Sequence, residues 1–195
     1  MNESIRSFIA VPIAPELAGS AGAVQESLRA GGPDVKWVDR ECFHLTLKFL
    51  GDVQRERLEA LWPSVEGVLD GIPRFRLRLH GVGAFPNPSR PRVIWVAVAE
   101  GAAELIALAA AVEKACGLHG FAEEERPFQA HLTVGRVRRP APNSRLEAGI
   151  AEMRDREVGA MEAERVLLMR SDLKPGGPVY HVLHEKLLTK GMLDE

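Results

Sequence analysis

Cysteine is scarce in this sequence, and its placement suggests neither a metal site nor a disulfide framework. Cys42 and Cys116 are the only two cysteines among 195 residues, they stand far apart, and no CxxC or zinc-type Cys/His spacing surrounds them. Two free thiols are typical of a reducing compartment. We therefore expect no metal and no other cofactor, and we expect a cytoplasmic location.

Long apolar runs are also lacking. The N-terminal stretch MNESIRSFIAVPIAPELAG has an apolar core of only about half a dozen residues, which is shorter than the core of a signal sequence. It falls far short of the ~18 apolar residues that a membrane-spanning helix needs. We expect no association with a membrane.

Basic residues are not in excess. The chain has 25 Lys and Arg against 27 Asp and Glu, a net charge of -2 at pH 7. Without a global positive field, any nucleic acid must be bound by a local arrangement of Arg and Lys. The 46% hydrophobic and 27% charged composition is that of a folded globular protein, and nothing in it indicates an obligate protein partner.

One pattern occurs twice along the chain. A β-rich run over residues 6–13 precedes a helical pattern over residues 15–32, and a strand containing His-Leu-Thr follows at residues 43–51. The second half repeats the order, with a β-branched run, an alanine-rich helical pattern and another His-Leu-Thr. The two motif histidines lie 131 - 44 = 87 residues apart, and the same offset carries Phe8 to Trp95. This repetition indicates an internal duplication.

The remaining segments complete an α+β fold. Residues 74–85 alternate charged and apolar side chains, which is typical of a half-exposed antiparallel strand. Two closing strands are predicted over residues 161–173 and 178–188, on either side of a KPGGP turn. We predict one domain over residues 1–195, with two pseudo-symmetric lobes whose mostly antiparallel sheets flank a central groove. Helices cover the outer faces, and each lobe is expected to bury its strands against its own helices.

The repeated motif has apolar side chains on one face of its strand and polar side chains on the other. Alternate side chains of a strand share a face, so His44 and Thr46 point one way and the leucines point the other; His131 and Thr133 do the same. If the lobes are related by pseudo-two-fold symmetry, both pairs line one groove. A neutral and a protonated imidazole form an acid/base pair for attack on a phosphodiester, and threonine hydroxyls can donate to phosphate oxygens. A single such motif is more often structural, but two matched copies favour catalysis.

These motifs have a known counterpart. HLTLKFLG and HLTVGR, with FIAVPI, GAFPNPSRPRVIWVAV and RSDLKPGGPVY, resemble the bacterial and archaeal RNA 2′,3′-cyclic phosphodiesterases, or 2′-5′ RNA ligases, of the two-histidine phosphoesterase superfamily. The resemblance implies opening of a terminal 2′,3′-cyclic phosphate of RNA to a 2′-phosphate, without a metal, and reversible 2′-5′ ligation in some members. It implies His44 as proton donor and His131 as proton acceptor, with Thr46, Thr133 and Arg136 binding the phosphate.

Further contacts are predicted from strand geometry. Strict alternation places Arg136 on the face opposite His131, so its role requires a bulge, for which Gly135 is a plausible position. Alternation places Lys48 on the His44 face, as a second cation or as a lysine at the groove edge. Phe49 and Tyr180 are weaker candidates for substrate contacts, with a core role as the alternative. Arg138 and Arg139 could contact an RNA backbone.

Other functions compete with RNA end hydrolysis. A phosphodiesterase for a small cyclic or 2′-5′-linked nucleotide would use the same groove chemistry, because loops set the size of the substrate. A binder of phosphorylated RNA ends without turnover is the alternative from another class. Two histidines suited to acid and base roles count against the binder, since binding alone requires neither.

Overall fold

The computed structural model describes residues 4–31 and 34–190, and their architecture is α+β. Two antiparallel sheets contain the strands. The four-stranded sheet has the order β3-β1-β8-β9, with β3 (His44–Gln54), β1 (Ser4–Pro12), β8 (Arg165–Lys174) and β9 (Gly177–Leu187). The five-stranded sheet has the order β2-β6-β5-β4-β7, with β2 (Val35–Trp37), β6 (His131–Val137), β5 (Val93–Glu100), β4 (Phe75–Phe85) and β7 (Glu157–Ala163).

The helical pattern expected over residues 15–32 is confirmed as α1 (Pro15–Arg29), and three further helices follow in the described residues. They are α2 (Arg55–Leu69), α3 (Ala102–Leu118) and α4 (Ser144–Glu152), with a 3-10 turn η1 (Arg40–Cys42). Pro15 opens α1, where its missing N–H costs no hydrogen bond. Asn143 caps α4, because its side-chain oxygen accepts the Leu146 N–H at 3.1 Å. No helix in these residues has the length and apolar character to cross a membrane.

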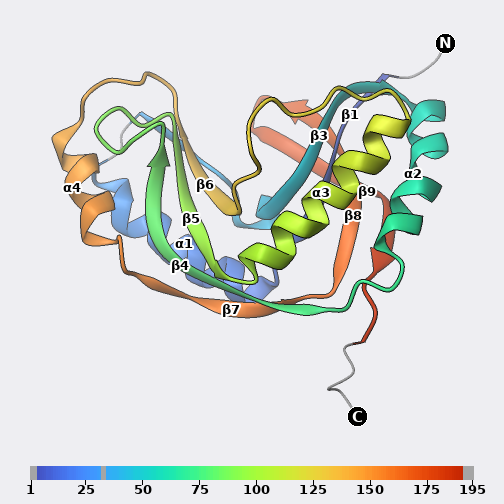
Figure 1. Cartoon of the computed structure of the whole chain (residues 1–195). Coiled ribbons are helices and arrows are strands. Elements are labelled where there is room, and N and C mark those ends of the chain that lie inside the picture. The colour runs from blue at the N-terminus through green and yellow to red at the C-terminus, as the bar shows by residue number, and fades with distance from the viewer. Residues whose placement is uncertain (1–3, 32–33, 191–195) are drawn as a thin grey trace.

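The two copies of the repeat exchange their helices. Helix α1 belongs to the first copy but packs on β6 and β7 of the five-stranded sheet, while α3 of the second copy packs on β3 and on α2. In Figure 1, α1 lies behind β4 and β5, and α2 and α3 lie together beside β3 and β9. Strand β2 also crosses, since it follows α1 and pairs with β6. The expectation that each lobe covers its strands with its own helices is therefore wrong.

The last third of the chain differs from the prediction at one point. The single strand expected over residues 161–173 is two strands, because the chain leaves β7 at Ala163 and enters β8 at Arg165. These strands belong to different sheets, with β7 beside β4 and β8 beside β1. The hairpin of β8 and β9 around the KPGGP turn is confirmed. This crossing places Tyr180 of β9 in the sheet that contains His44.

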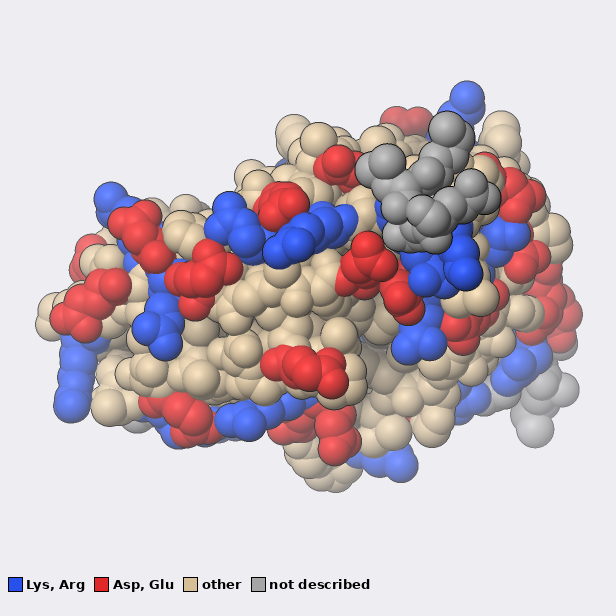
Figure 2. Space-filling model, turned by 90° about the horizontal axis from the view of Figure 1, so that it is seen from below, with Lys and Arg blue, Asp and Glu red and all other residues tan. Residues whose placement is uncertain are grey.

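The surface does not concentrate one sign of charge on the side seen from below Figure 1. Figure 2 shows acidic and basic side chains interspersed there, around apolar and neutral residues. This arrangement agrees with the nearly balanced composition of the chain. A substrate anion must therefore be held by particular side chains in the groove rather than by the field of this face.

Candidate active site

The two repeated motifs meet in one groove. His44 and Thr46 of β3 and His131 and Thr133 of β6 all line an open cavity of about 1640 Å³. Strands β3 and β6, which come from different sheets, are also in direct contact. The structure thus brings together the four residues that the sequence motif singles out.

Backbone carbonyls orient both imidazoles in the same way. His44 Nδ1 lies 2.8 Å from the carbonyl oxygen of Cys42, and His131 Nδ1 lies 2.7 Å from that of Gln129. A carbonyl oxygen can only accept, so Nδ1 carries the hydrogen in each ring. The other nitrogen, Nε2, is left to accept a proton when the ring is neutral and to donate one when it is charged. Sequence reasoning missed these carbonyls, because any residue type supplies one.

Aromatic rings fix the positions of the imidazoles. Phe8 stacks on His44 at a centroid distance of 4.6 Å, and Tyr180 meets the same ring edge-on at 5.3 Å. Phe85 meets His131 edge-on at 5.1 Å. These contacts restrict ring rotation and remove water from the imidazoles. Tyr180, predicted as a weak candidate, lines the groove and touches a motif histidine.

Burial makes both imidazoles more acidic than a histidine in water. It lowers the pKa of His44 from 6.5 to about 4, against the raising effect of the bond to Cys42, and the charge of Arg136 lowers it further. Burial also lowers the pKa of His131, with the same opposing carbonyl bond and the same contribution from Arg136. In the empty groove at neutral pH, both rings are therefore neutral.

A β-bulge brings Arg136 to the histidine face. Against β5, Thr133 pairs with Trp95 but Gly135 pairs with Ile94, so Val134 is one extra residue in β6. The extra residue reverses the alternation, and Arg136 joins Thr133 on the face that lines the groove. The predicted bulge is present, one position before Gly135. The effect of Arg136 on the pKa of both histidines places its charge near both.

A matching bulge in β3 lies just before the buried Lys48. Thr46 pairs with Ala10 and Lys48 with Ile9, so Leu47 is the extra residue. Lys48 is only 3% exposed, and its Nζ donates to Glu113 Oε1 at 2.7 Å and to the Ala122 carbonyl at 2.6 Å. Lys48 still lines the groove together with His44, with its ammonium group bound by Glu113 and Ala122, so its contact with a substrate stays a prediction.

The two bulges correspond under the duplication. Since 47 + 87 = 134, Leu47 and Val134 occupy equivalent positions, and Phe49 is the counterpart of Arg136. Phe49 is 55% exposed and lines the groove, and its counterpart Arg136 lines the same groove from the other copy. One half of the groove therefore offers a cation and the other an aromatic ring at the same place.

Comparison with known proteins agrees with this duplicated site. The family model described as "LigT like Phosphoesterase" matches the chain twice, over residues 11–95 and again over residues 96–180. This chain belongs to the LigT-like phosphoesterase family. The two consecutive matches confirm the internal duplication, and each contains one His-x-Thr motif.

Relatives within the family share most of their length with the chain. The RNA 2′,3′-cyclic phosphodiesterase of Methanothermobacter thermautotrophicus is 36% identical over 176 residues, which cover 90% of this chain and 95% of the relative. That of Thermotoga maritima is 32% identical, covering 97% and 98%. The crystal structure of TT0787 of Thermus thermophilus is similar with a TM-score of 0.79 and 29% identity, over 95% of this chain and 99% of that one.

Proposed function

We propose that this LigT-like phosphoesterase hydrolyses the 2′,3′-cyclic phosphate at the 3′ end of RNA to a 2′-phosphate, without a metal. The observation that carries the proposal is the matched pair of imidazoles. Each is held through Nδ1 by a carbonyl two residues before it, and both line one groove. The names of the relatives, which are RNA 2′,3′-cyclic phosphodiesterases, support the substrate.

The reaction needs one proton removed and one supplied. Nε2 of His131 takes a proton from water, and the water oxygen forms a bond to phosphorus. The bond between phosphorus and the 3′ oxygen breaks, and Nε2 of His44, as imidazolium, gives its proton to that oxygen. The products are a 2′-phosphate and a free 3′ hydroxyl. With a 5′ hydroxyl in place of water as the nucleophile, the same step forms a 2′-5′ phosphodiester and frees the 3′ hydroxyl, which is ligation; its reversal cleaves a 2′-5′ linkage.

The negative charge of the substrate favours the protonation that His44 needs. With both rings neutral in the empty groove, His44 must gain a proton before it can act as an acid. A phosphodiester anion next to the imidazoles favours their charged form. Thr46 and Thr133 hydroxyls and the Arg136 guanidinium hold the phosphate oxygens in this scheme. In the same scheme Phe49 and Tyr180, which line the groove, contact the terminal nucleoside, and Lys48 is a further cation beside it.

The proposal is tested with an RNA oligonucleotide that ends in a 2′,3′-cyclic phosphate, in the presence of EDTA. His44→Ala and His131→Ala are each expected to lower kcat by about 10²- to 10⁴-fold, the usual contribution of a general acid or base. His181→Ala is the matched control, because His181 is an exposed histidine of β9 that does not line the groove. Circular dichroism verifies that each variant is folded.

The nature of the product decides the direction of the reaction. A 2′-phosphate supports the assignment of His44 to the 3′ oxygen, whereas a 3′-phosphate would reverse the two histidine roles. Full activity in either histidine variant would contradict the two-histidine mechanism. Loss of wild-type activity in EDTA would contradict metal independence.

A further inference from the structure

Three cations form a row along one end of the groove. In the pairing of β2 with β6, Lys36 stands directly opposite Arg136, and Arg138 follows two residues after Arg136. All three line the same cavity as the motif histidines, and along the chain Arg138 lies further from His131 than Arg136 does. Among the described residues, none of the three side chains has an ion pair or a side-chain hydrogen bond.

This row is unfavourable without an anion. Like charges directly opposite each other on paired strands destabilise a sheet, and here no carboxylate compensates them in the described part of the chain. Arg138 lies just past the end of β6 at Val137, two residues after Arg136, which is about 6.6 Å for an extended chain. Such a spacing is comparable with that of successive phosphates in a nucleic acid strand. The row begins beside Thr133 and leads away from the histidines.

The size of the groove also exceeds the need of one nucleotide. Its volume is about 1640 Å³, whereas sites for small ligands generally measure about 300–1,000 Å³. The groove therefore has room for more than the terminal nucleotide.

We propose that Lys36 and Arg138 form a second phosphate subsite, which binds the phosphodiester immediately 5′ to the nucleotide that carries the cyclic phosphate. This inference rests on the proposed function and deepens it, because it makes a polynucleotide end, rather than a single small nucleotide, the preferred substrate. Arg136 lies between the two subsites and serves the reacting phosphate.

The test compares two substrates, a 2′,3′-cyclic mononucleotide and a short RNA ending in the same nucleotide. Lys36→Ala and Arg138→Ala are each expected to lower kcat/KM for the RNA by about five- to tenfold and to leave kcat/KM for the mononucleotide unchanged. For the RNA, the slope of log kcat/KM against log salt should become shallower by about 0.7 for each cation removed, as for the loss of one contact to a single strand. Arg139→Ala is the matched control, because Arg139 is adjacent in sequence but does not line this groove.

Two results would overturn the subsite. An equal loss of kcat/KM on both substrates would assign Lys36 and Arg138 to the reacting phosphate. Unchanged kinetics on the RNA would show that neither residue contacts the substrate. In either case, turnover of the cyclic phosphate by the wild type leaves the proposed function standing. Binding gives a readout without catalysis. The two variants should weaken binding of an RNA ending in a 2′-phosphate and not of a nucleoside 2′-phosphate, and equal binding by variants and wild type would contradict the subsite.

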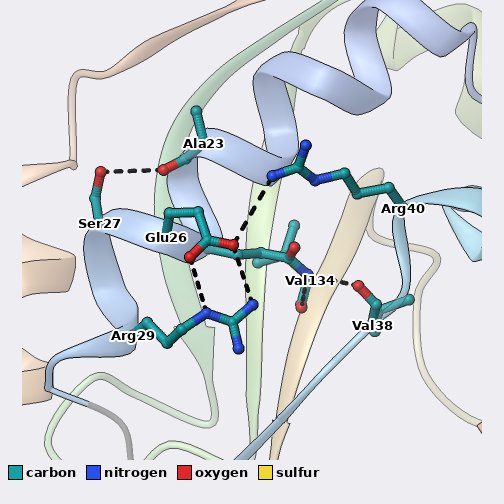
Figure 3. A network of polar contacts seen from close by, with 8 residues as sticks. Ala23, Glu26, Ser27, Arg29, Val38, Arg40 and Val134 are labelled. Atoms are coloured by element: carbon teal, nitrogen blue, oxygen red, sulfur yellow. Dashed lines mark hydrogen bonds and ion pairs between the residues drawn. The ribbon is translucent and has the colours of Figure 1, made fainter.

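A different observation concerns the bulge that presents Arg136. Gln25 of α1 is only 2% exposed, and its Nε2 donates to the carbonyl oxygens of Val38 at 2.7 Å and of Val134 at 2.8 Å. Val134 is the extra residue of the bulge, and its carbonyl also accepts the Val38 N–H at 3.0 Å. Figure 3 shows Val134 and Val38 next to α1, with Glu26 bridging Arg29 and Arg40 close by.

Both amide hydrogens of Gln25 are used to hold this bulge. A bulge takes a residue out of the regular strand pairing. The Val134 carbonyl already accepts the Val38 N–H, so Gln25 supplies its second donor and ties α1 to both Val134 and Val38. We infer that Gln25 is a positioning residue: it holds the Val134 carbonyl and thereby keeps Arg136 on the histidine face. It acts on the reaction through Arg136 and does not touch the substrate.

A double-mutant cycle separates positioning from general stabilisation. Gln25→Met keeps the length of the side chain but removes both donors, and it should lower kcat/KM by about tenfold in the wild-type background, within the range for coupled residues. In an Arg136→Ala background, the same substitution should have little further effect. Ser27→Ala is the control, because the exposed Ser27 hydroxyl bonds only to the Ala23 carbonyl of its own helix.

A pH series adds a second readout. Gln25→Glu places a carboxylate against two carbonyls, but its protonated form has one hydrogen to donate. The activity of this variant relative to the wild type should therefore rise as the pH falls, and that of Gln25→Met should not. An equal loss from Gln25→Met in both backgrounds would overturn the positioning role.

Discussion

The histidines of the groove combine a fixed tautomer with a low affinity for protons. The carbonyls of Cys42 and Gln129 determine which nitrogen is free, and this selection survives protonation because Nδ1 donates in both charge states. Burial beside Phe8 and Tyr180, with the charge of Arg136, disfavours the imidazolium form of His44. The imidazolium form of His44 is scarce until the substrate phosphate binds. Proton uptake by His44 is therefore coupled to substrate binding.

This coupling predicts different pH profiles for kcat/KM and kcat. The profile of kcat/KM reports the free enzyme, where the pKa of His44 is about 4. Because the acid must be protonated, kcat/KM should fall as the pH rises, with its basic limb below the usual histidine pKa of about 6.5. The basic limb of kcat should lie at higher pH, since the bound phosphate raises the pKa. Steady-state kinetics on a 2′,3′-cyclic nucleotide measures both, and coinciding basic limbs would contradict the coupling.

His44 should also make the protein less stable in acid. Its pKa is about 4 in the folded state and 6.5 for an unperturbed histidine, so between these values the unfolded chain binds the proton and the folded chain does not. Stability is therefore lost as the pH falls from 6.5 toward 4. The free energy of unfolding, measured with urea at about pH 7 and at about pH 4.5, should be lower at the lower pH. This decrease should be about 2 kcal/mol larger for the wild type than for His44→Gln. Equal decreases for the two proteins would show that the imidazole is not the cause.

At the scale of single elements, the bulges decide which side chains reach the groove. Alternation correctly predicted that His44 and Thr46 share a face, because no bulge lies between them. It does not hold beyond Thr46, since one extra residue at Leu47 puts the buried Lys48 out of step and brings the exposed Phe49 to the groove. For Arg136, a bulge was predicted only because the family resemblance already implied that it binds the phosphate. A one-residue insertion leaves no mark in the hydrophobic pattern, so such side-chain directions require the structure.

Gly135 gives a direct test of the second bulge. A Cβ on Gly135 would lie 2.8 Å from Val35 Cγ1 and 3.0 Å from Trp37 Cε3, so in Gly135→Ala these two side chains of β2 must shift. Such overpacking typically costs about 1–3 kcal/mol, and the shift should also lower kcat/KM through Arg136. Gly67→Ala in α2 is the control, because nothing lies within 4 Å of the added carbon. Urea unfolding and kinetics measure both effects, and an unchanged Gly135→Ala would contradict a tightly packed bulge.

At the scale of the molecule, the duplicated halves are interlocked. Most of the order of strands and helices was predictable from hydrophobic patterns, apart from the division into β7 and β8, and the 87-residue offset of the histidines correctly indicated a duplication. The patterns could not show which sheet a helix covers, because the apolar stripe of α1 fits either sheet. Likewise, the buried Gln25 looks like any polar residue on a helix surface until the contact with Val134 is seen. The exchange of α1 and α3 ties each His-x-Thr strand to the other copy.

Interlocking predicts that the two sheets unfold as one unit. Leu28 is a buried residue of α1, the helix that covers the five-stranded sheet, and it belongs to the single core cluster that includes residues of both sheets. Leu28→Ala should lower the free energy of unfolding by about 2–5 kcal/mol. If the halves are cooperative, native-state hydrogen exchange should show the same decrease for the slowest amides of β1 and β8, in the four-stranded sheet, as for those of β5 and β6. A decrease confined to β5 and β6 would mean that each sheet is stable by itself, and that the groove can open by unfolding one side.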